Sequence, residues 1–138
     1  MATGKSASMT TPQLLLVENE ALLQEVLGIA LADAGFEIIA AGSATQAVAE
    51  LESDATRFKA VITDIKLGEG QDGWLVGHRA RELVPDVPVV YISGDSGHEW
   101  SSKGVPDSVM IMKPYTPVQL VTAVATLVTN TDTRRASM

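Results

Sequence analysis

Five short apolar runs alternate with segments of helical period along this chain, and this alternation limits the fold more than any other feature. The runs are rich in Val, Ile, Leu and Ala, and each has the length of a buried strand. They occupy residues 13–18, 37–41, 58–63, 87–92 and 108–112. Strands that alternate with helices usually pair in parallel, with helices on both faces of the sheet. The pattern therefore predicts an α/β fold, a doubly wound five-stranded parallel sheet.

Local signals predict where the helices begin and end. Helices are expected at residues 20–34, 44–53, 74–84 and 117–130, with at most a short helix between 94 and 106. The residues that cap or stop them are Gly35, Ser43, Pro85, Thr116 and Gln119, the last two forming a capping box. In the first helix, Leu22 and Val26 belong to a broad apolar stripe that is expected to face the core.

Composition and charge exclude several classes of function. The 138 residues suit one domain over 13–130, between a flexible tail at 1–12 and a polar tail at 131–138. The net charge of -7 argues against binding to nucleic acid or to an anionic membrane surface. The absence of cysteine and the presence of only 2 histidines exclude thiolate chemistry and a multi-histidine metal site. No apolar run approaches the ~20 residues that span a bilayer, so we expect a cytoplasmic protein.

Polar side chains follow four of the predicted strands. Glu18 and Asn19 follow the first strand, Asp64 the third, Ser93 the fourth and Lys113 the fifth. The carboxyl ends of parallel strands lie side by side, so these residues are expected to meet in one pocket. Asp64 alone could be a loop-capping residue. Together with the other strand ends, it is predicted to be a nucleophile that accepts a phosphoryl group as an aspartyl phosphate.

The same pocket offers oxygen ligands for a divalent cation. Phosphoryl transfer to a carboxylate brings two anions together, and a cation bound to both reduces their repulsion. Glu18, Asn19 and Asp64 carry the oxygen donors that Mg²⁺ prefers. Lys66 could add its backbone carbonyl, while its side chain could reach the phosphoryl group, repel the metal or remain solvated. Asn19 also suits the N-cap of a helix that begins at Glu20, whose carboxylate the helix dipole explains.

Ser93 and Lys113 are candidates for contacts with the phosphoryl group. The Ser93 hydroxyl could donate to a phosphoryl oxygen, although a serine before a glycine is also common in turns. Lys113 follows a buried strand and needs an anionic partner, for which Asp64 is the obvious candidate. The peptide bond to Pro114 could be cis or trans, which the sequence does not decide.

Four segments resemble the receiver domain of two-component response regulators. They read LLLVENE, AVITDIKLGEGQDGW, VVYISGDS and MIMKPY, and the resemblance covers about residues 13–130. It implies a sheet of strand order 2-1-3-4-5. It also implies a phosphoacceptor, Asp64, a switch hydroxyl, Ser93, and a phosphate-pairing lysine, Lys113. The implied metal ligands are Glu18, Asn19, Asp64 and the backbone carbonyl of Lys66.

Three departures from the family pattern affect the expected chemistry. The family usually has Asp where this chain has Asn19, which implies weak Mg²⁺ binding and slower chemistry at the phosphoacceptor. The family often has an aromatic residue where this chain has Met110, so the usual switch coupled to a hydroxyl is absent unless Tyr115 replaces it. The segment between the fourth and fifth strands is also short and contains three glycines, Gly94, Gly97 and Gly104.

The last helix has an unusual outer surface. From 116 to 130 it contains no charged residue, and its face away from the core offers Val118, Thr122, Ala125 and Thr129. Surface helices normally carry charge, so this face is expected to pack against a partner or, as a homodimer, against a second copy. A merely threonine-rich exposed helix is the alternative. Trp100 could anchor a partner or fill a loop.

The function predicted from these features is that of a single-domain response regulator. A sensor histidine kinase or a histidine phosphotransfer protein would phosphorylate Asp64, and the protein would signal by protein–protein interaction or drain phosphoryl groups. No substrate turnover is expected beyond its own phosphorylation and dephosphorylation. The alternative is a phosphate-independent pseudo-receiver, which Asn19 and Met110 favour. A flavodoxin is disfavoured by the acidic loop after the first strand, and an aspartate-based phosphatase by Lys66.

Overall fold

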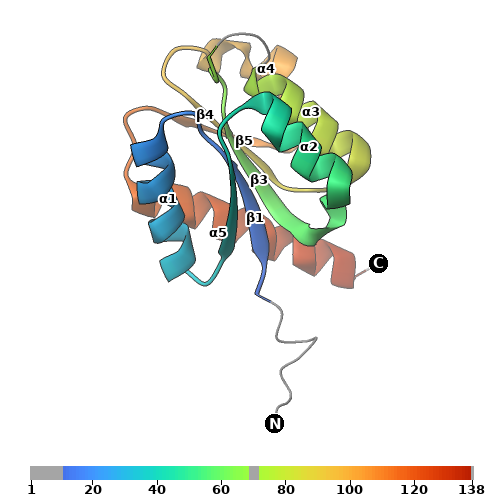
Figure 1. The fold of residues 1–138 in the computed structure, drawn as a ribbon. Helices are drawn as coiled ribbons and strands as arrows, with labels where there is room; N and C mark the ends of the chain where they lie inside the picture. Colours follow the sequence, from blue (N-terminus) through green and yellow to red (C-terminus); the bar gives the residue numbers. More distant parts are fainter. Residues whose placement is uncertain (1–10, 69–71, 138) are drawn as a thin grey trace.

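The structure is a computed structural model that describes residues 11–68 and 72–137. Its strands form one parallel sheet of order β2-β1-β3-β4-β5 (Figure 1). The strands are β1 (Gln13–Val17), β2 (Glu37–Ala41), β3 (Phe58–Asp64), β4 (Val89–Ser93) and β5 (Val109–Met112). The predicted fold class and strand order are therefore confirmed. Residues 69–71 of the glycine-rich loop GEGQDG at 68–73, and residues 1–10 of the expected N-terminal tail, lie outside the described residues.

Helices cover both faces of the sheet. They are α1 (Ala21–Asp33), α2 (Ala44–Asp54), α3 (Gly73–Leu83), the short α4 (Trp100–Lys103) and α5 (Pro117–Ala136), with 3₁₀ turns η2 (Ala55–Arg57) and η3 (Gly97–Glu99). α1 and α5 lie on one face, and α2 and α3 on the other (Figure 1). Successive side chains of a strand point to opposite faces, so each inner strand supplies two apolar cores. Leu15 and Val61 belong to the core under α2 and α3, and Leu14 and Ile62 to the core under α1 and α5.

Most of the predicted end signals are confirmed. Gly35 has a φ of +102°, the left-handed conformation that ends α1. Ser43 accepts a hydrogen bond from the Gln46 amide at 3.1 Å as the N-cap of α2. The capping box of α5 is present, with the Thr116 hydroxyl accepting from the Gln119 amide at 3.2 Å. These local interactions fix where the chain leaves each strand and enters the following helix.

The predicted N-cap of the first helix is wrong. α1 begins at Ala21, and its N-cap residue is Glu20 rather than Asn19. The carboxylate of the buried Glu18 accepts a hydrogen bond from the Glu20 amide at 2.9 Å, and no side chain among the described residues caps the first turn of α1. The side chain of Asn19 is thereby left free for the pocket described below.

Two further predictions about the helices are wrong. Leu22 and Val26 are 75% and 43% exposed, so they do not belong to the core face of α1. The last helix continues to Ala136 instead of ending at 130. No proline or glycine interrupts residues 131–136, and Thr131 is buried. Arg135 also pairs with Asp86, which ties the last turn of α5 to the loop before β4.

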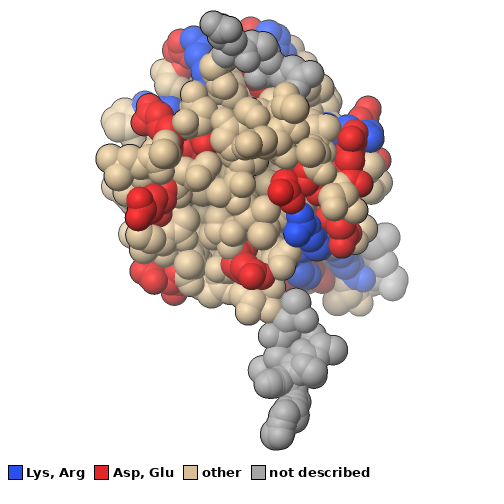
Figure 2. Space-filling view, viewed as in Figure 1, with Lys and Arg blue, Asp and Glu red and all other residues tan. Residues whose placement is uncertain are grey.

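The surface carries few basic groups among many acidic ones. In Figure 2, red acidic side chains are dispersed over the visible face, and blue basic side chains gather near its edges beside acidic ones. This distribution agrees with the net charge of -7. Among the helices that the structure describes, none is long and apolar enough to cross a membrane.

Candidate functional site

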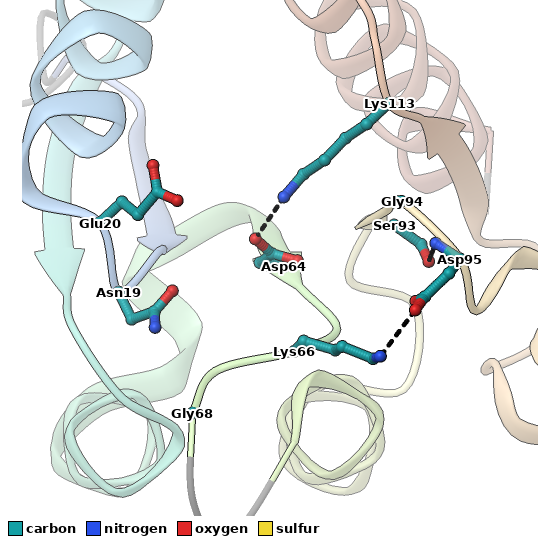
Figure 3. A pocket seen from close by; sticks show the side chains of 9 residues that line it. All are labelled: Asn19, Glu20, Asp64, Lys66, Gly68, Ser93, Gly94, Asp95 and Lys113. Carbon is teal, nitrogen blue, oxygen red and sulfur yellow. Dashed lines mark hydrogen bonds and ion pairs between the residues drawn. The ribbon is translucent and has the colours of Figure 1, made fainter.

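A pocket of about 500 Å³ lies at the carboxyl end of the sheet (Figure 3). Four loops form it, those that follow β1, β3, β4 and β5. The residues that line it are Asn19, Glu20, Asp64, Lys66, Gly68, Ser93, Gly94, Asp95 and Lys113. The structure therefore brings together five of the six candidate site residues. The sixth, Glu18, lies behind the pocket wall and is buried.

Asp64 and Lys113 face each other across this pocket. The Lys113 ammonium donates a hydrogen bond to Asp64 Oδ2 at 3.0 Å (Figure 3). The Asp64 side chain is 6% exposed and that of Lys113 is 37% exposed. Burial lowers the pKa of Lys113, but its hydrogen bond to Asp64 and the negative charges around it outweigh this effect, so its pKa lies above the usual value. The lysine is thus a fixed positive charge beside the buried carboxylate.

The position of Asp64 depends on a close approach of α3. A Cβ atom on Gly73, the first residue of α3, would lie only 2.1 Å from the Asp64 carbonyl oxygen. The Gly73 amide donates a hydrogen bond to the Ile65 carbonyl at 2.8 Å. Only glycine lets the helix start this close to the strand end. Gly73 is a site-forming residue that the sequence interpretation missed, although it lies within the segment AVITDIKLGEGQDGW that resembles the family.

Glu18 is a buried acid next to the phosphoacceptor candidate. Its Oε2 accepts a hydrogen bond from the Glu20 amide, while its Oε1 has no hydrogen-bond partner among the described residues. Burial raises the pKa of Glu18 to about 7, and the charge of Asp64 adds to the rise. The raised pKa and the unpaired oxygen both indicate that too little positive charge surrounds the Glu18 carboxyl group to stabilise its ionised form.

Asn19 and Glu20 form the opposite wall of the pocket (Figure 3). Both side chains are exposed, and a Cβ atom on Gly68 would lie 3.8 Å from Asn19 Nδ2. Glu20, which the sequence interpretation assigned only to the helix dipole, therefore adds a carboxylate to the pocket that Asn19 does not supply. Its place directly after Asn19, at the end of an apolar strand, was the signal that could have identified it.

Ser93 holds the loop that follows β4. Its hydroxyl oxygen is buried and accepts hydrogen bonds from the amides of Asp95 at 3.2 Å and Ser96 at 2.6 Å. The turn role considered from the sequence is therefore present. The hydroxyl proton is still available for an acceptor in the pocket, because an oxygen that accepts two hydrogen bonds can also donate one.

The side chain of Lys66 pairs with Asp95 at the mouth of the pocket. Its ammonium lies 2.7 Å from Asp95 Oδ2, and both side chains are largely exposed (Figure 3). This hydrogen bond raises the pKa of Lys66 and lowers that of Asp95. The pair connects the loop after β3 with the loop after β4. Asp95 was not among the predicted site residues, because its sequence context is that of an ordinary loop aspartate.

Met110, which departs from the family pattern, and Tyr115, the residue considered as its replacement, pack on different faces of the sheet. Met110 is half-buried against the core under α2 and α3. Tyr115 packs on the other face, and its hydroxyl is buried without a partner among the described residues. Burial raises the pKa of Tyr115 to about 12, with further contributions from Glu18 and Asp64. The bond between Lys113 and Pro114 is cis.

Trp100 combines the two roles that the sequence left open. Its indole nitrogen donates to the Ser108 hydroxyl at 2.9 Å, and its ring packs over Gly104, where a Cβ atom would lie 2.4 Å from Cδ1. The residue is 37% exposed. It therefore closes the loop around α4 and also presents an edge to solvent.

The oxygen atoms of the pocket fit a hard divalent cation, although their charge is low. Within residues 11–68 and 72–137, no group of three or more acidic or histidine side chains gathers closely enough to hold a metal ion alone. The donors available are Asp64, Glu20, the amide oxygen of Asn19 and backbone carbonyls. The unpartnered Oε1 of Glu18 lies behind them. This donor chemistry suits Mg²⁺, which usually keeps several waters and few protein ligands.

The sheet is doubly wound, and its pocket lies at the point where the strand order reverses, with Lys113 facing Asp64. These features define a class of α/β domains that carry their chemistry at the carboxyl ends of the strands. The chain belongs to one family of this class, the response regulator receiver domains, whose family model matches residues 14–125. The resemblance seen in the sequence is thus confirmed.

Solved structures and a curated relative agree with this assignment. A response regulator receiver protein from Sinorhizobium medicae WSM419 is 41% identical with a TM-score of 0.85, over 89% of this chain and 98% of that one. A CheY-like receiver domain protein from Methanospirillum hungatei JF-1, 22% identical over 91% of this chain and 99% of that one, shares the fold with a TM-score of 0.80. The transcriptional regulatory protein DctD of Rhizobium meliloti (strain 1021), named for C4-dicarboxylate transport, is 29% identical over 112 residues. That match covers 80% of this chain but only 24% of DctD.

Proposed function

We propose that Asp64 accepts a phosphoryl group from a phosphohistidine of a sensor histidine kinase or histidine phosphotransfer protein. A carboxylate oxygen of Asp64 forms the new bond to phosphorus, and the nitrogen–phosphorus bond of the donor breaks. The imidazole nitrogen keeps the electron pair and takes up a proton. The observation that supports this proposal most strongly is the buried Asp64 carboxylate, paired with Lys113 at 3.0 Å and open to a pocket.

Two side chains of the pocket are proposed to respond to the added charge. Lys113, already paired with Asp64, neutralises a phosphoryl oxygen. Ser93 donates its free hydroxyl proton to another phosphoryl oxygen. This donation reorients a hydroxyl that also holds the amides of Asp95 and Ser96, so it changes the loop before α4. The added charge at Asp64 thereby reaches the surface of the domain.

Magnesium is the proposed cofactor. The residues that would hold it are Asp64, Asn19, Glu18 and the backbone carbonyl of Lys66, with Glu20 adding charge from the pocket wall. A bound Mg²⁺ would lower the repulsion between the carboxylate and the incoming phosphoryl group. Asn19 supplies an amide oxygen in place of a charged one, so the proposed affinity is weak.

The proposed output is protein–protein interaction or the removal of phosphoryl groups from a phosphodonor. The domain is proposed to work in the cytoplasm, without binding nucleic acid or membranes, in keeping with its net charge of -7. We also propose that the protein acts as a single-domain response regulator.

A second candidate function is that of a phosphate-independent binding module. The neutral Asn19 in the pocket and the aliphatic Met110 on β5 favour it, because both weaken the usual response to phosphorylation. The two candidates differ in one observable property, which is the chemical modification of Asp64.

Intact-mass spectrometry after incubation with acetyl phosphate separates the two candidates. We expect a gain of one phosphoryl group that depends on magnesium and is absent from Asp64→Asn, which keeps the size of the side chain. An unchanged mass with acetyl phosphate and with a phosphorylated histidine phosphotransfer protein would reject the phosphoacceptor role and support the binding module.

A further inference from the structure

Two neighbouring residues of the sheet lie beside the turn that leads from β4 to α4. Ser93, the last residue of β4, is the register partner of Met112, the last residue of β5. Side chains alternate between the faces of a strand, and Tyr91 and Met110, each two residues earlier, both pack in the core under α2 and α3. Ser93 and Met112 therefore lie side by side on this face of the sheet.

These two residues contact consecutive residues at the start of η3. The Ser93 hydroxyl oxygen accepts a hydrogen bond from the Ser96 amide at 2.6 Å. The thioether of Met112 lies against the next residue, Gly97, where a Cβ atom would be 2.5 Å from Sδ and 3.1 Å from Cε. Because Gly97 has no side chain, the Met112 side chain can lie directly on the backbone of η3. This contact is called the Met112–Gly97 contact below.

The far end of the segment is held by parts of the molecule that do not line the pocket. His78 Nε2, on α3, lies 2.7 Å from the carbonyl oxygen of Lys103, the last residue of α4. The Val105 amide donates a hydrogen bond to the buried Tyr91 hydroxyl at 3.2 Å. The segment from η3 to α4 is thus fixed at its end, while its start is held from the ends of β4 and β5. A change at these strand ends therefore shifts the start of the segment relative to its end.

The two holding residues are also next to the groups that respond to the phosphoryl group in the proposed function. Met112 directly precedes Lys113, whose ammonium pairs with Asp64 at 3.0 Å. The Lys113 amide donates to the Ser93 carbonyl at 2.8 Å, so the ends of β4 and β5 are joined at this point. When the Ser93 hydroxyl turns to a phosphoryl oxygen, its hydrogen bond to the Ser96 amide changes. The Met112–Gly97 contact then determines where η3 lies on the sheet.

We propose that Met112 is a positioning residue that couples the phosphoacceptor pocket to η3 and α4 through its contact with Gly97. This inference rests on the proposed phosphorylation of Asp64. An unbranched thioether chain suits the role, because it adapts to a small shift of its neighbour without losing contact. Tyr115, which the sequence offered for such a coupling, packs on the opposite face of the sheet.

Fluorine NMR of the full chain tests the coupling, because Trp100 is the first residue of α4. Fluorotryptophan at the 2 tryptophans gives two resonances, which Trp100→Phe assigns. We expect acetyl phosphate with Mg²⁺ to shift the Trp100 resonance of the wild type. Met112→Ala should gain the same phosphoryl mass but lose this shift, whereas Met112→Leu, which keeps the side-chain volume, should retain it. Leu75→Ala is the matched control, since Leu75 is 39% exposed on α3 and Met112 is 47% exposed, and it should also retain the shift.

A second variant removes the contact from its other side. In Gly97→Ala the new methyl group takes the place of the thioether, so this variant should also lose the Trp100 shift while its mass gain stays unchanged. Circular dichroism would show that each variant is folded.

The mass and the resonance separate the two proposals. A Trp100 shift that survives in Met112→Ala and Gly97→Ala, that Leu75→Ala also abolishes, or that is absent from the phosphorylated wild type would overturn the coupling and leave the phosphoacceptor role intact. A wild type that gains no phosphoryl mass would overturn both.

Discussion

Glu18→Gln should stabilise this protein at alkaline pH and leave its stability unchanged in acid. Glu18 is buried, its Oε1 has no hydrogen-bond partner among the described residues, and its pKa is raised to about 7 by burial and by Asp64. The variant keeps an oxygen that can accept from the Glu20 amide, as Glu18 does now at 2.9 Å. Its amide group replaces an ionised oxygen beside Asp64 with a hydrogen-bond donor.

The size of the effect follows from the rise in pKa. The folded state holds the Glu18 proton up to about pH 7, while the unfolded chain releases it near its ordinary value of 4.5. The folded state therefore binds the extra proton between these two pH values, and the free energy of unfolding falls as the pH rises through this window. At about 1.4 kcal/mol per pKa unit, the loss is about 3 kcal/mol when the group is fully ionised.

Urea unfolding of both proteins, with EDTA to remove divalent cations, measures this difference. At about pH 8 the variant should be more stable by about 3 kcal/mol, and at about pH 5 the two proteins should differ by much less. The same advantage at both pH values would mean that the variant acts through packing. A less stable variant at the higher pH would refute the assignment of Glu18 as a strained buried acid.

Three further variants, one of them with a control on α1, test the geometry of the pocket. Gly73→Ala should lower the free energy of unfolding by about 1–3 kcal/mol in urea, because its Cβ would lie 2.1 Å from the Asp64 carbonyl oxygen. Gly28→Ala, which meets nothing within 4 Å on α1, should instead stabilise by about 0.5–1 kcal/mol, and equal effects would refute the close-approach argument. Asn19→Asp should tighten Mg²⁺ binding about tenfold in a tryptophan fluorescence titration, and an unchanged affinity would place the metal elsewhere. Lys113→Met should slow labelling by acetyl phosphate about tenfold or more, and an unchanged rate would mean that its contact with Asp64 at 3.0 Å is only structural.

The sheet and its pocket could be predicted because the relevant signals are local. An apolar strand followed by a polar residue places that residue at the carboxyl edge, as with Asp64, Ser93 and Lys113. The N-caps of α2 and α5 are equally local, since Ser43 and Thr116 act on amides three residues away.

The features that the sequence did not reveal depend on contacts between distant segments. The close approach at Gly73 depends on how α3 meets the end of β3, and no residue near it signals that packing. Arg135 extends α5 by pairing with Asp86, which lies 49 residues earlier. Leu22 fits the apolar pattern of α1, yet the neighbouring helix leaves it exposed. Periodicity identifies an apolar stripe, but only the packed structure shows whether another element covers it.

The identity of the phosphoacceptor is the central claim of the proposed function. Borohydride reduces an aspartyl phosphate to homoserine, so reduction after treatment with acetyl phosphate and Mg²⁺ marks the acceptor permanently. Digestion and tandem mass spectrometry then locate it. We predict homoserine in place of Asp64, in a magnesium-dependent amount. Homoserine at another acidic residue, or at none, would contradict the account.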